Sequence, residues 1–256
     1  MKKLENRVAL ITGSDSGIGR AIALAFAAEG AKVVITYHSD EASAAQVTNQ
    51  INEQGHTAIC FKLDVTDEAA VKDLFSKVQA RFDNIDILVN NAAVNGSGAP
   101  VKEMLTDVFD TCIKTNLYGP FYCCRAFLNQ PNLREGNIIF ISSIHEDVNT
   151  PGNADYNASK AAIKNFSRSL ALEVAGQGIR VNNIAPGMIL TDMNKEAMEN
   201  DEVRREKAAH IPMKKAGTPE DITGVAVFLA AAESAYVTGA TFVVDGGLSI
   251  NTGQGA

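Results

Sequence analysis

The sequence predicts an α/β fold in which one doubly wound parallel sheet of about seven strands carries helices on both faces. Three observations support this fold class. Short β-branched runs alternate with helical segments along the whole chain, the order that a parallel sheet with crossover helices requires. The runs are largely apolar, as strands buried on both faces are. The 256 residues, of which 46% are hydrophobic, are enough for one core, so we expect a single domain over residues 1–256.

Each strand is expected where β-branched and aliphatic residues cluster, and each helix where apolar residues recur at helical spacing. Asp40, Asp67 and Thr218 precede three of the helices as capping candidates. The expected strands are 7–12, 32–37, 57–63, 85–90, 137–142, 180–185 and 241–244. The expected helices are 17–29, 41–54, 68–82, 106–128, 156–175 and 219–231.

Residues 188–217 interrupt this alternation. The segment is charged, weakly periodic and longer than an ordinary connection between a strand and a helix. Two interpretations remain open, a mobile lid over an active site and an inserted helical excursion. We favour the lid.

Charge and cysteine content narrow the function classes. The chain has 23 Lys and Arg against 30 Asp and Glu, a net charge of −7, so it lacks the basic surface that binds nucleic acids or anionic membranes. The four cysteines form no C-x-x-C pair, and Cys123 and Cys124 are adjacent, which favours reduced core residues over disulfides or zinc ligands. The first apolar run, 8–11, is too short for a secretion signal or a membrane span. We expect a cytoplasmic protein.

A glycine-rich turn follows the first expected strand. Residues 12–20 read Thr-Gly-Ser-Asp-Ser-Gly-Ile-Gly-Arg and lead into an Ala-rich helix. The spacing G-x-x-x-G-x-G differs from G-x-G-x-x-G, and no Lys-Ser/Thr pair completes a P-loop. Glycines let the backbone approach a ligand, and amide groups at a helix N-terminus bind a pyrophosphate. Alone, the motif indicates either a dinucleotide site or only a tight turn.

Further motifs follow in a fixed order: Asp64-Val65, Asn90-Asn91-Ala92-Ala93, Asn116, Ser143, Tyr156-x-x-x-Lys160 and Pro186-Gly187. With the glycine turn they resemble the short-chain dehydrogenase/reductase family over essentially the whole chain, and within it the glucose 1-dehydrogenase group. The resemblance implies a Rossmann-type domain and an NAD(P)-dependent oxidoreductase that moves a hydride between the nicotinamide and a secondary alcohol or ketone. One departure is Ala93, where the family usually has glycine.

Tyr156 and Lys160 lie four residues apart in an expected helix, so they share one face. To act as a base near pH 7 to 8, a tyrosine must lower its pKa by about 2 to 3 units from about 10, and a neighbouring ammonium and an oxidised nicotinamide favour that shift. The resemblance makes Tyr156 the proton donor or acceptor, Lys160 its partner and a ribose ligand, Ser143 the group that positions the substrate oxygen, and Asn116 the holder of a relay water. The reaction requires no metal, and the histidines show no metal-ligand spacing.

The end of the second strand bears on cofactor preference. An NAD-specific site places a carboxylate about 20 residues after the glycine turn, yet Thr36-Tyr37-His38-Ser39 stands there. The turn itself has Asp15 and no Lys or Arg before Arg20, so we expect NADP(H) to be preferred and NAD(H) to be accepted. The cofactor residues that the resemblance implies are Gly13, Ser16, Gly17, Ile18, Gly19, Tyr37, His38, Ser39, Asp64, Val65, Asn91, Ala92, Ala93, Tyr156, Lys160, Pro186, Gly187, Ile189 and Thr191.

The substrate is expected to be a small polyhydroxylated molecule such as a sugar. Polar side chains follow the strands at the end of the sheet where α/β folds bind ligands, and the candidates are Asn95, His145, Glu146 and Asn153. A long acyl chain would instead need an apolar groove, which Pro151, Met188, Ile189, Leu190 and Met193 can form if the 188–217 segment closes. A 3-oxoacyl-acyl-carrier-protein reductase is therefore one alternative function. A second is a non-catalytic, cofactor-sensing member of the fold, because a fold does not fix a function.

The expected helices 106–128 and 156–175 have apolar or small residues on more than one face, including Ala158, Ala161 and Ala162. Small residues allow helices to approach closely, which a helix facing solvent does not need. With the family resemblance, this pattern predicts a homotetramer.

Overall fold

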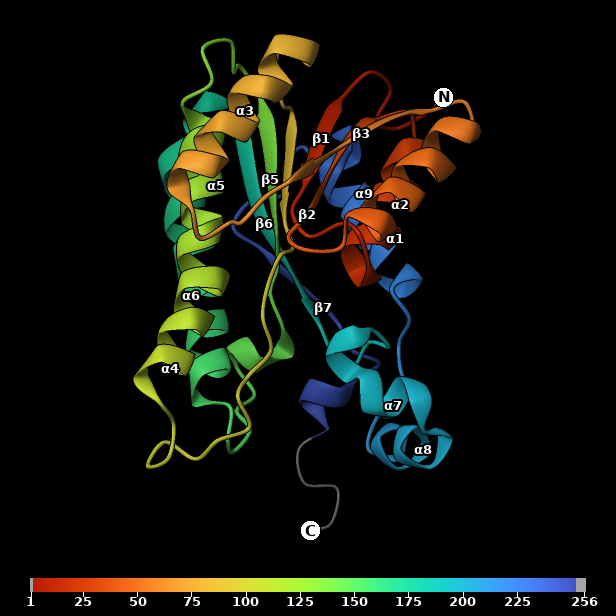
Figure 1. The fold of residues 1–256 in the computed structure, drawn as a ribbon, viewed down its shortest axis with the longest axis vertical. Coiled ribbons are helices and arrows are strands. Elements are labelled where there is room, and N and C mark those ends of the chain that lie inside the picture. Colours follow the sequence, from red (N-terminus) through yellow and green to blue (C-terminus); the bar gives the residue numbers. More distant parts are fainter. Residues whose placement is uncertain (1, 252–256) are drawn as a thin grey trace.

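The computed structural model describes residues 2–251. Seven strands form one parallel sheet in the order β3-β2-β1-β4-β5-β6-β7 (Figure 1), so the predicted fold class and strand number are confirmed. The strands are β1 Val8–Ile11, β2 Lys32–Tyr37, β3 Thr57–Lys62, β4 Ile87–Asn90, β5 Gly136–Ile141, β6 Ile179–Pro186 and β7 Thr241–Val244.

The strand order reverses beside β1. This strand pairs with β2, in the register Val8 to Lys32, and on its other side with β4, in the register Ala9 to Ile87. The connections after β1 and β4 therefore leave the sheet in opposite directions, and a crevice opens at the carboxyl ends of these two strands. In open α/β sheets, such a crevice is the place where ligands bind.

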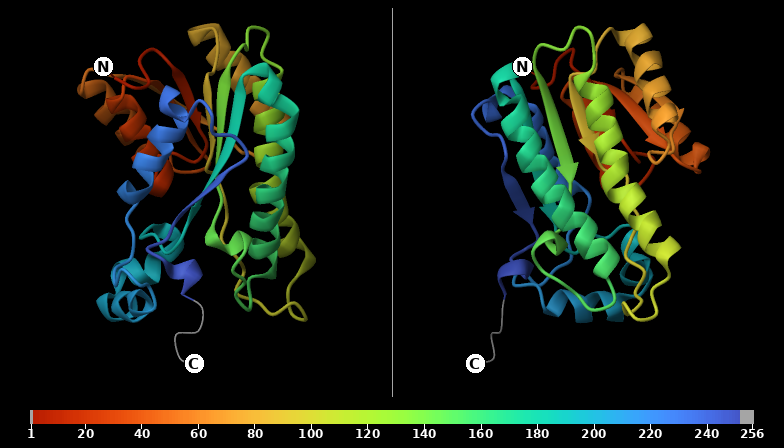
Figure 2. Two further views of the ribbon diagram at one scale, coloured as in Figure 1. Left: turned by 180° about the vertical axis from the view of Figure 1, so that it is seen from behind. Right: turned by 90° about the vertical axis from the view of Figure 1, so that its left-hand side faces the viewer.

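Helices cover both faces of the sheet (Figures 1 and 2). On one face α1, α2 and α9 pack over a core that includes the fully buried Phe26 and Ile222, and on the other α3, α5 and α6 enclose Phe127 and Phe140. The helices are α1 Gly17–Ala28, α2 Glu41–Glu53, α3 Glu68–Phe82, α4 Thr106–Ile113, α5 Gly119–Leu128, α6 Ala154–Val174, α7 Lys195–Glu199, α8 Asp201–Ala209 and α9 Glu220–Ala230.

Two of the three expected caps are present. The carboxylates of Asp40 and Asp67 accept hydrogen bonds from the first amide groups of α2 and α3, which satisfies donors that have no partner inside the helix. Thr218 does not cap α9. Its amide group instead donates to Asp221 at 2.8 Å, and the helix begins at Glu220 after Pro219.

The expected helix over 106–128 is not continuous. A π-helical turn, Lys114–Tyr118, separates α4 from α5, and Asn116 lies in this turn. Its buried side chain bonds to neighbouring segments, as described below. Reading the segment as one helix did not reveal this break, because a π turn is a single-turn feature inside an otherwise helical segment.

Residues 188–217 contain helices α7 and α8 (Figure 1). The two ends of the segment pair with each other: Leu190 N–H donates to the Gly217 carbonyl, and Gly217 N–H donates to the Met188 carbonyl, both at 2.9 Å. The helical excursion considered from sequence is therefore present, and its ends are joined at a short parallel bridge. Among residues 2–251, no helix is both long and apolar enough to cross a membrane.

Candidate active site

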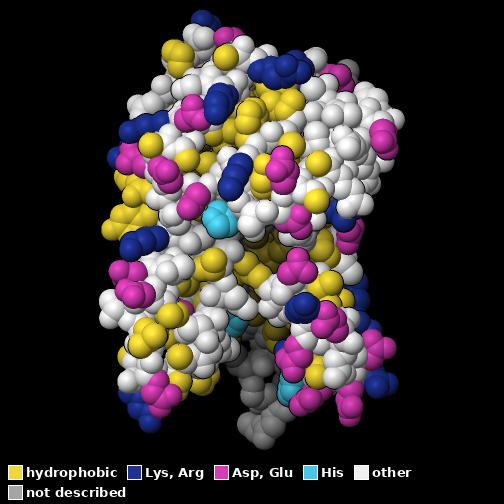
Figure 3. Space-filling model, in the orientation of Figure 1, with side chains coloured by type: hydrophobic (Ala, Val, Ile, Leu, Met, Phe, Trp, Pro, Cys, Tyr) yellow, Lys and Arg dark blue, Asp and Glu magenta, His cyan; other side chains and the backbone are white. Residues whose placement is uncertain are grey.

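A cavity of about 830 Å³ opens at the carboxyl ends of the strands. Its volume is within the range of small-molecule and cofactor sites. Figure 3 shows the molecule hollowed near the centre of the face drawn, with hydrophobic side chains in the depth of the hollow. The lining comes from the glycine turn, from the ends of the central strands, from α6 and from the 188–217 segment.

The glycine turn has the geometry that a phosphate site needs. Gly13 and Gly17 adopt φ values of +59° and +53°, which favour glycine. A Cβ atom on Gly19 would lie 2.3 Å from the Gly13 carbonyl oxygen. The backbone of α1 therefore approaches the turn too closely at this position for any side chain. Ser16 precedes α1 without a side-chain cap, which leaves the first amide groups of the helix for a ligand.

Side chains from other strands hold this turn. Thr12 Oγ1 accepts from the amide groups of Asn91 and Ala92 at 2.9 and 3.0 Å, and Asn91 Nδ2 donates to the Gly13 carbonyl at 2.7 Å. Thr36 Oγ1 accepts from Gly13 N–H at 3.1 Å. The turn is therefore fixed before a ligand arrives, and these residues fit a dinucleotide whose pyrophosphate lies at the start of α1.

Most of the expected cofactor residues line the cavity. Gly19 and Tyr37 do not: Gly19 acts through packing, and Tyr37 is buried at the end of β2. Ala93 lines the cavity, so the extra methyl group lies at its wall. The expected residues that do line it are Gly13, Ser16, Gly17, Ile18, His38, Ser39, Asp64, Val65, Asn91, Ala92, Ala93, Tyr156, Lys160, Pro186, Gly187, Ile189 and Thr191.

Ser143, Tyr156 and Lys160 all line the cavity. Ser143 follows β5, and its hydroxyl accepts from His145 N–H at 3.2 Å. Tyr156 and Lys160 lie one turn apart on α6, and Lys160 Nζ is 5.4 Å from the centre of the Tyr156 ring. Lys160 Nζ donates to the Ile141 carbonyl at 3.0 Å, which ties the helix to the end of β5.

In the protein without cofactor, the pKa of Tyr156 lies above its ordinary value. The lowering predicted from the Lys160 ammonium together with an oxidised nicotinamide stays a prediction. Burial raises the pKa of Tyr156 to about 12, although the nearby Ser143 hydroxyl acts in the opposite direction. Burial also lowers the pKa of Lys160 to about 8, because a charged group loses its hydration. A tyrosinate in this site therefore requires a further positive charge beyond that of Lys160.

Asn116 does not point its amide group at solvent or at the cavity. Its Oδ1 accepts from Val94 N–H at 2.8 Å, and its Nδ2 donates to the Val94 carbonyl at 3.0 Å and to Ser159 Oγ at 3.1 Å. The amide group thus fixes the loop after β4 to α6. The relay water that the resemblance implies at Asn116 stays a prediction.

The four expected substrate residues divide into two pairs. Asn95 and His145 line the cavity. His145 Nδ1 lies 2.7 Å from the Val148 carbonyl, so in the neutral ring Nδ1 carries the proton and Nε2 is free to accept. Glu146 and Asn153 do not line the cavity; Glu146 pairs with Lys164, and Asn153 Nδ2 donates to Thr150. Neither of these two side chains therefore forms part of the cavity wall.

Several lining residues were not expected from sequence. Val148 and Thr150 belong to the loop before α6, and Asp192 and Asn194 to the 188–217 segment. Leu248 comes from the far end of the chain. No local motif marks such residues, because only the path of the chain brings them to the cavity. Among residues 2–251, no group of three His, Cys, Asp or Glu side chains is placed to hold a metal ion.

Comparison with known proteins gives the same family as these motifs. A family described as enoyl-(acyl carrier protein) reductase matches residues 13–249. The chain is 38% identical to glucose 1-dehydrogenase 2 of Bacillus subtilis (strain 168) over 255 residues, covering 99% of this chain and 98% of the relative. It is 36% identical to the L-rhamnose 1-dehydrogenase (NAD(P)(+)) of Sphingomonas sp. (strain SKA58), covering 98% of this chain and 99% of the relative.

A solved structure agrees closely in fold. The gluconate 5-dehydrogenase from Burkholderia cenocepacia J2315, in complex with NADP and tartrate, superposes with a TM-score of 0.90 at 33% identity and with 97% of each chain covered. The relatives and the site geometry lead to one assignment. The chain belongs to the short-chain dehydrogenase/reductase family and is an NAD(P)-dependent oxidoreductase that acts on alcohol or carbonyl groups.

Proposed function

We propose that this protein oxidises a hydroxyl group of a sugar or a similar small polyol, with Ser143, Tyr156 and Lys160 as its catalytic residues. The observation that carries the proposal is the convergence of these three side chains on the cavity beside the preformed glycine turn. When bound, the nicotinamide accepts or donates the hydride. Tyr156 exchanges the proton on the substrate oxygen, and Ser143 positions that oxygen by a hydrogen bond.

Lys160 has two roles in the proposal. Its ammonium stabilises the tyrosinate electrostatically, and it donates to a ribose hydroxyl of the cofactor. Burial raises the pKa of Tyr156, so the positive charge of an oxidised nicotinamide is needed to complete the shift. Tyr156 would then transfer its proton efficiently only in the cofactor complex. Without the cofactor, the buried phenol would stay protonated. Asn116 is proposed to hold a water molecule through which the proton reaches solvent.

A polar substrate suits the polar groups around the reacting centre. Each hydroxyl group that leaves water needs a new hydrogen-bond partner, and His145 Nε2, Asn95 and Thr150 offer partners at the cavity wall. The glucose, rhamnose and gluconate dehydrogenases among the relatives support a sugar or sugar acid. An intact set of Ser143, Tyr156 and Lys160 speaks against a non-catalytic, cofactor-sensing role.

The test compares two substrate classes in one assay. We expect kcat/KM for NADP-dependent oxidation of glucose, rhamnose or gluconate to exceed that for reduction of an acetoacetyl thioester by NADPH. We also expect His145→Ala to lower sugar oxidation and leave the thioester reaction unchanged. If the thioester is the better substrate and His145→Ala affects neither reaction, the apolar groove of Met188, Ile189 and Met193 decides the substrate, and the acyl-carrier-protein alternative is correct.

We propose that NADP(H) is preferred and NAD(H) accepted. His38 and Ser39 line the cavity after β2, and the Asp40 carboxylate is committed to Ser43, with Oδ1 2.9 Å from its amide nitrogen and Oδ2 2.8 Å from its hydroxyl. The Asp40 carboxylate is therefore not free to hold a ribose 2′-hydroxyl. Asp15, whose pKa is raised by burial and also by Asp40, limits the preference. A hundredfold or greater preference for NAD in kcat/KM would contradict this proposal.

The 188–217 segment is proposed to act as a lid. Its two ends are bridged at Ile189 and Gly217. Helices α7 and α8, which lie between them, could therefore move together, with this bridge as the hinge. Asn95 Nδ2 donates to the Met193 carbonyl at 3.2 Å, a contact that joins the segment to the opposite wall of the cavity. Hydrogen exchange should slow over residues 195–209 when cofactor and substrate bind, and equal exchange in both states would contradict a lid.

We also propose a homotetramer in the cytoplasm. Leu105, which directly precedes α4, exposes 70% of its surface, and Leu172 on α6 exposes 85%. Ala158 and Ala161 are also exposed on α6. Exposed apolar residues on neighbouring helices are typical of subunit contacts. All four cysteines are free thiols, which suits a reducing compartment.

A further inference from the structure

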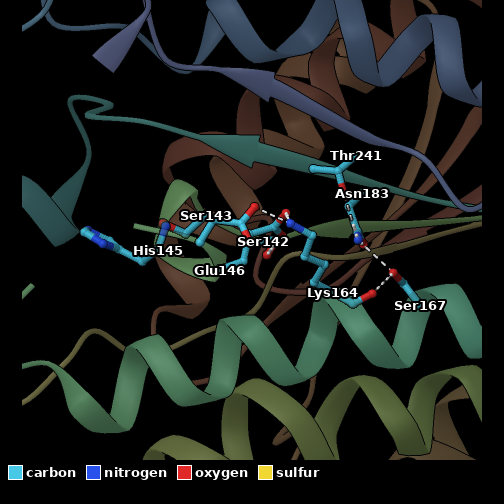
Figure 4. A network of polar contacts seen from close by, with 9 residues as sticks. Ser142, Ser143, His145, Glu146, Lys164, Ser167, Asn183 and Thr241 are labelled. Atoms are coloured by element: carbon cyan, nitrogen blue, oxygen red, sulfur yellow. Dashed lines mark hydrogen bonds and ion pairs between the residues drawn. The ribbon is translucent and has the colours of Figure 1, made fainter. Parts of the chain in front are cut away.

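Glu146 is a buried carboxylate next to the catalytic residues that the proposed mechanism does not use. Its side chain is only 2% exposed, and it lies in the short 3-10 turn Ile144–Glu146 that follows Ser143. Buried carboxylates are rare without a specific partner. In Figure 4 the side chains of Glu146 and Lys164 extend toward each other, whereas His145 lies on the far side of Ser143.

Two side chains hold the Glu146 carboxylate. Ser142 Oγ donates to Oε2 at 2.7 Å, and Lys164 Nζ lies 3.3 Å from Oε1. Lys164 also pairs with Asp147, whose side chain is 67% exposed. Lys164 is thus shared between one buried and one exposed carboxylate, so it does not fully neutralise Glu146.

These contacts join the two elements that carry the catalytic residues. Ser142 directly precedes Ser143 at the end of β5, and Glu146 N–H donates to the Ser143 carbonyl at 3.0 Å. Lys164 lies one helical turn beyond Lys160 on α6. The Glu146–Lys164 pair therefore connects the strand end with Ser143 to the helix with Tyr156 and Lys160. The network continues from the Lys164 carbonyl through Ser167 and Asn183 to β6 (Figure 4).

Besides Lys164, the Glu146 carboxylate acts on a second ammonium group, that of Lys160. Within residues 2–251, the ammonium of Lys160 forms no ion pair, and its hydrogen bond goes to the neutral Ile141 carbonyl. Two groups favour its charged form, Cys112 and Glu146. Burial raises the pKa of the Cys112 thiol, so Cys112 is uncharged near neutral pH. Of these two groups, the Glu146 carboxylate is the one that supplies a negative charge.

The titratable groups around Lys160 come from three elements. Tyr156 and Lys164 lie on α6, with Asp155 in its first turn, and Cys112 lies on α4. The 3-10 turn and the residue after it contribute His145, Glu146 and Asp147. Of the three carboxylates in this set, Asp155 is bonded to the amide groups of Ser97 and Tyr156, and Asp147 is mostly exposed.

We propose that Glu146 is a positioning residue of this dehydrogenase, which holds Ser143 against α6 through Ser142 and Lys164 and supplies the negative charge that balances the buried Lys160 ammonium. The inference rests on the proposed roles of Ser143, Tyr156 and Lys160. According to this proposal, the buried network affects the reaction itself and not only the stability of the fold. It also predicts that removing the Glu146 charge alters the ionisation of Lys160, which a purely structural ion pair would not do.

The experiment measures the titration of Lys160 directly. Lysine labelled with 13C at Cε is incorporated into the cofactor-free protein, and the Lys160 signal is identified by its absence in Lys160→Met. We expect Glu146→Gln, which keeps an oxygen for Ser142 but removes the charge, to lower the pKa of Lys160 by about one unit, the size of effect that one nearby charge exerts. In the wild type, burial sets this pKa at about 8.

The pH profile of the enzyme gives a second measurement. If Lys160 must be protonated, the alkaline limb of kcat/KM should move down by about one pH unit in Glu146→Gln. The loss would then be about tenfold at pH 9 and absent at pH 6. Glu146→Asp, which keeps the charge but shortens the side chain, should retain the Lys160 titration and lower kcat, because Ser143 is less well placed.

Asp147→Asn is the matched control, since it removes the other carboxylate on Lys164 and should leave Lys160 unchanged. A Lys160 titration that is the same in Glu146→Gln and wild type, or that moves equally in Asp147→Asn, would overturn the proposal. If Glu146→Gln does not fold, Glu146→Asp decides: a wild-type Lys160 titration supports the proposal, and a lost one contradicts it. Because the titration uses neither cofactor nor substrate, it stands even if the proposed substrate is wrong.

Discussion

Replacing Lys160 by methionine should make the protein more stable while removing its activity. The Lys160 side chain is buried, and burial lowers the pKa of its ammonium from the ordinary 10.5 to about 8. Near neutral pH the folded protein therefore holds a charge that would be more stable in water. Methionine has a similar length, no charge and a good fit to apolar surroundings, so the substitution relieves this unfavourable burial.

The size of the effect follows from the shift. The folded and ordinary pKa values of Lys160 differ by about 2.5 units, which corresponds to about 3 kcal/mol at 1.36 kcal/mol per unit. Losing the hydrogen bond to the Ile141 carbonyl offsets about 1 kcal/mol. The free energy of unfolding should thus rise by about 2 kcal/mol at pH 7, or about 4 to 8 °C in Tm for a chain of this size.

The pKa shift of Lys160 also sets the direction in which the free energy of unfolding changes with pH. Between pH 8 and 10.5 the unfolded chain binds more protons at Lys160 than the folded protein does, so wild-type stability should rise with pH across this window. Lys160→Met lacks the group, and its advantage over the wild type should shrink as the pH approaches 10.5. Differential scanning calorimetry at pH 7 and pH 10.5, at one protein concentration to keep subunit association constant, measures both differences.

Lys77→Met serves as a control, because Lys77 is exposed and pairs only with Asp73 on the same helix, an interaction of little energy. It should change Tm by about a degree at most at either pH. A Lys160→Met variant that melts below the wild type at pH 7, or an advantage that is the same at both pH values, would refute the reasoning that the buried charge destabilises the fold.

Three further outcomes are expected. Tyr156→Phe should lower kcat by about 10² to 10⁴-fold with cofactor affinity kept, measured by steady-state kinetics and fluorescence titration; more than a tenth of wild-type kcat would contradict its role. Gly19→Ala places a Cβ atom 2.3 Å from the Gly13 carbonyl and should weaken cofactor binding, whereas Gly224→Ala, with no atom within 4 Å, should bind normally. Leu172→Glu, at an exposed position of α6, should lower the mass found by light scattering if the protein is a tetramer, and a monomeric wild type would refute the tetramer.

The sequence alone determined the fold class and most of the residues that line the cavity proposed for the cofactor. Apolar runs long enough for buried strands alternate with amphipathic segments, and this local pattern leaves few arrangements other than a parallel sheet covered by helices. The turn around Gly13, Gly17 and Gly19 was recognisable because its geometry depends on backbone conformation within a few residues. Tyr156 and Lys160 could be paired because helical spacing sets their common face.

The tertiary structure decided the features that depend on burial and on contacts between distant segments. Sequence placed Glu146 beside the substrate, but the short turn after Ser143 directs it to Lys164 on α6. The sequence predicted that an ammonium and an oxidised nicotinamide together lower the pKa of Tyr156. The folded chain adds a contribution that raises this pKa, because removing a phenol from water disfavours its ionisation. Local patterns predict which elements form. Desolvation and the direction of a side chain depend on what packs around it, and only the folded chain determines that.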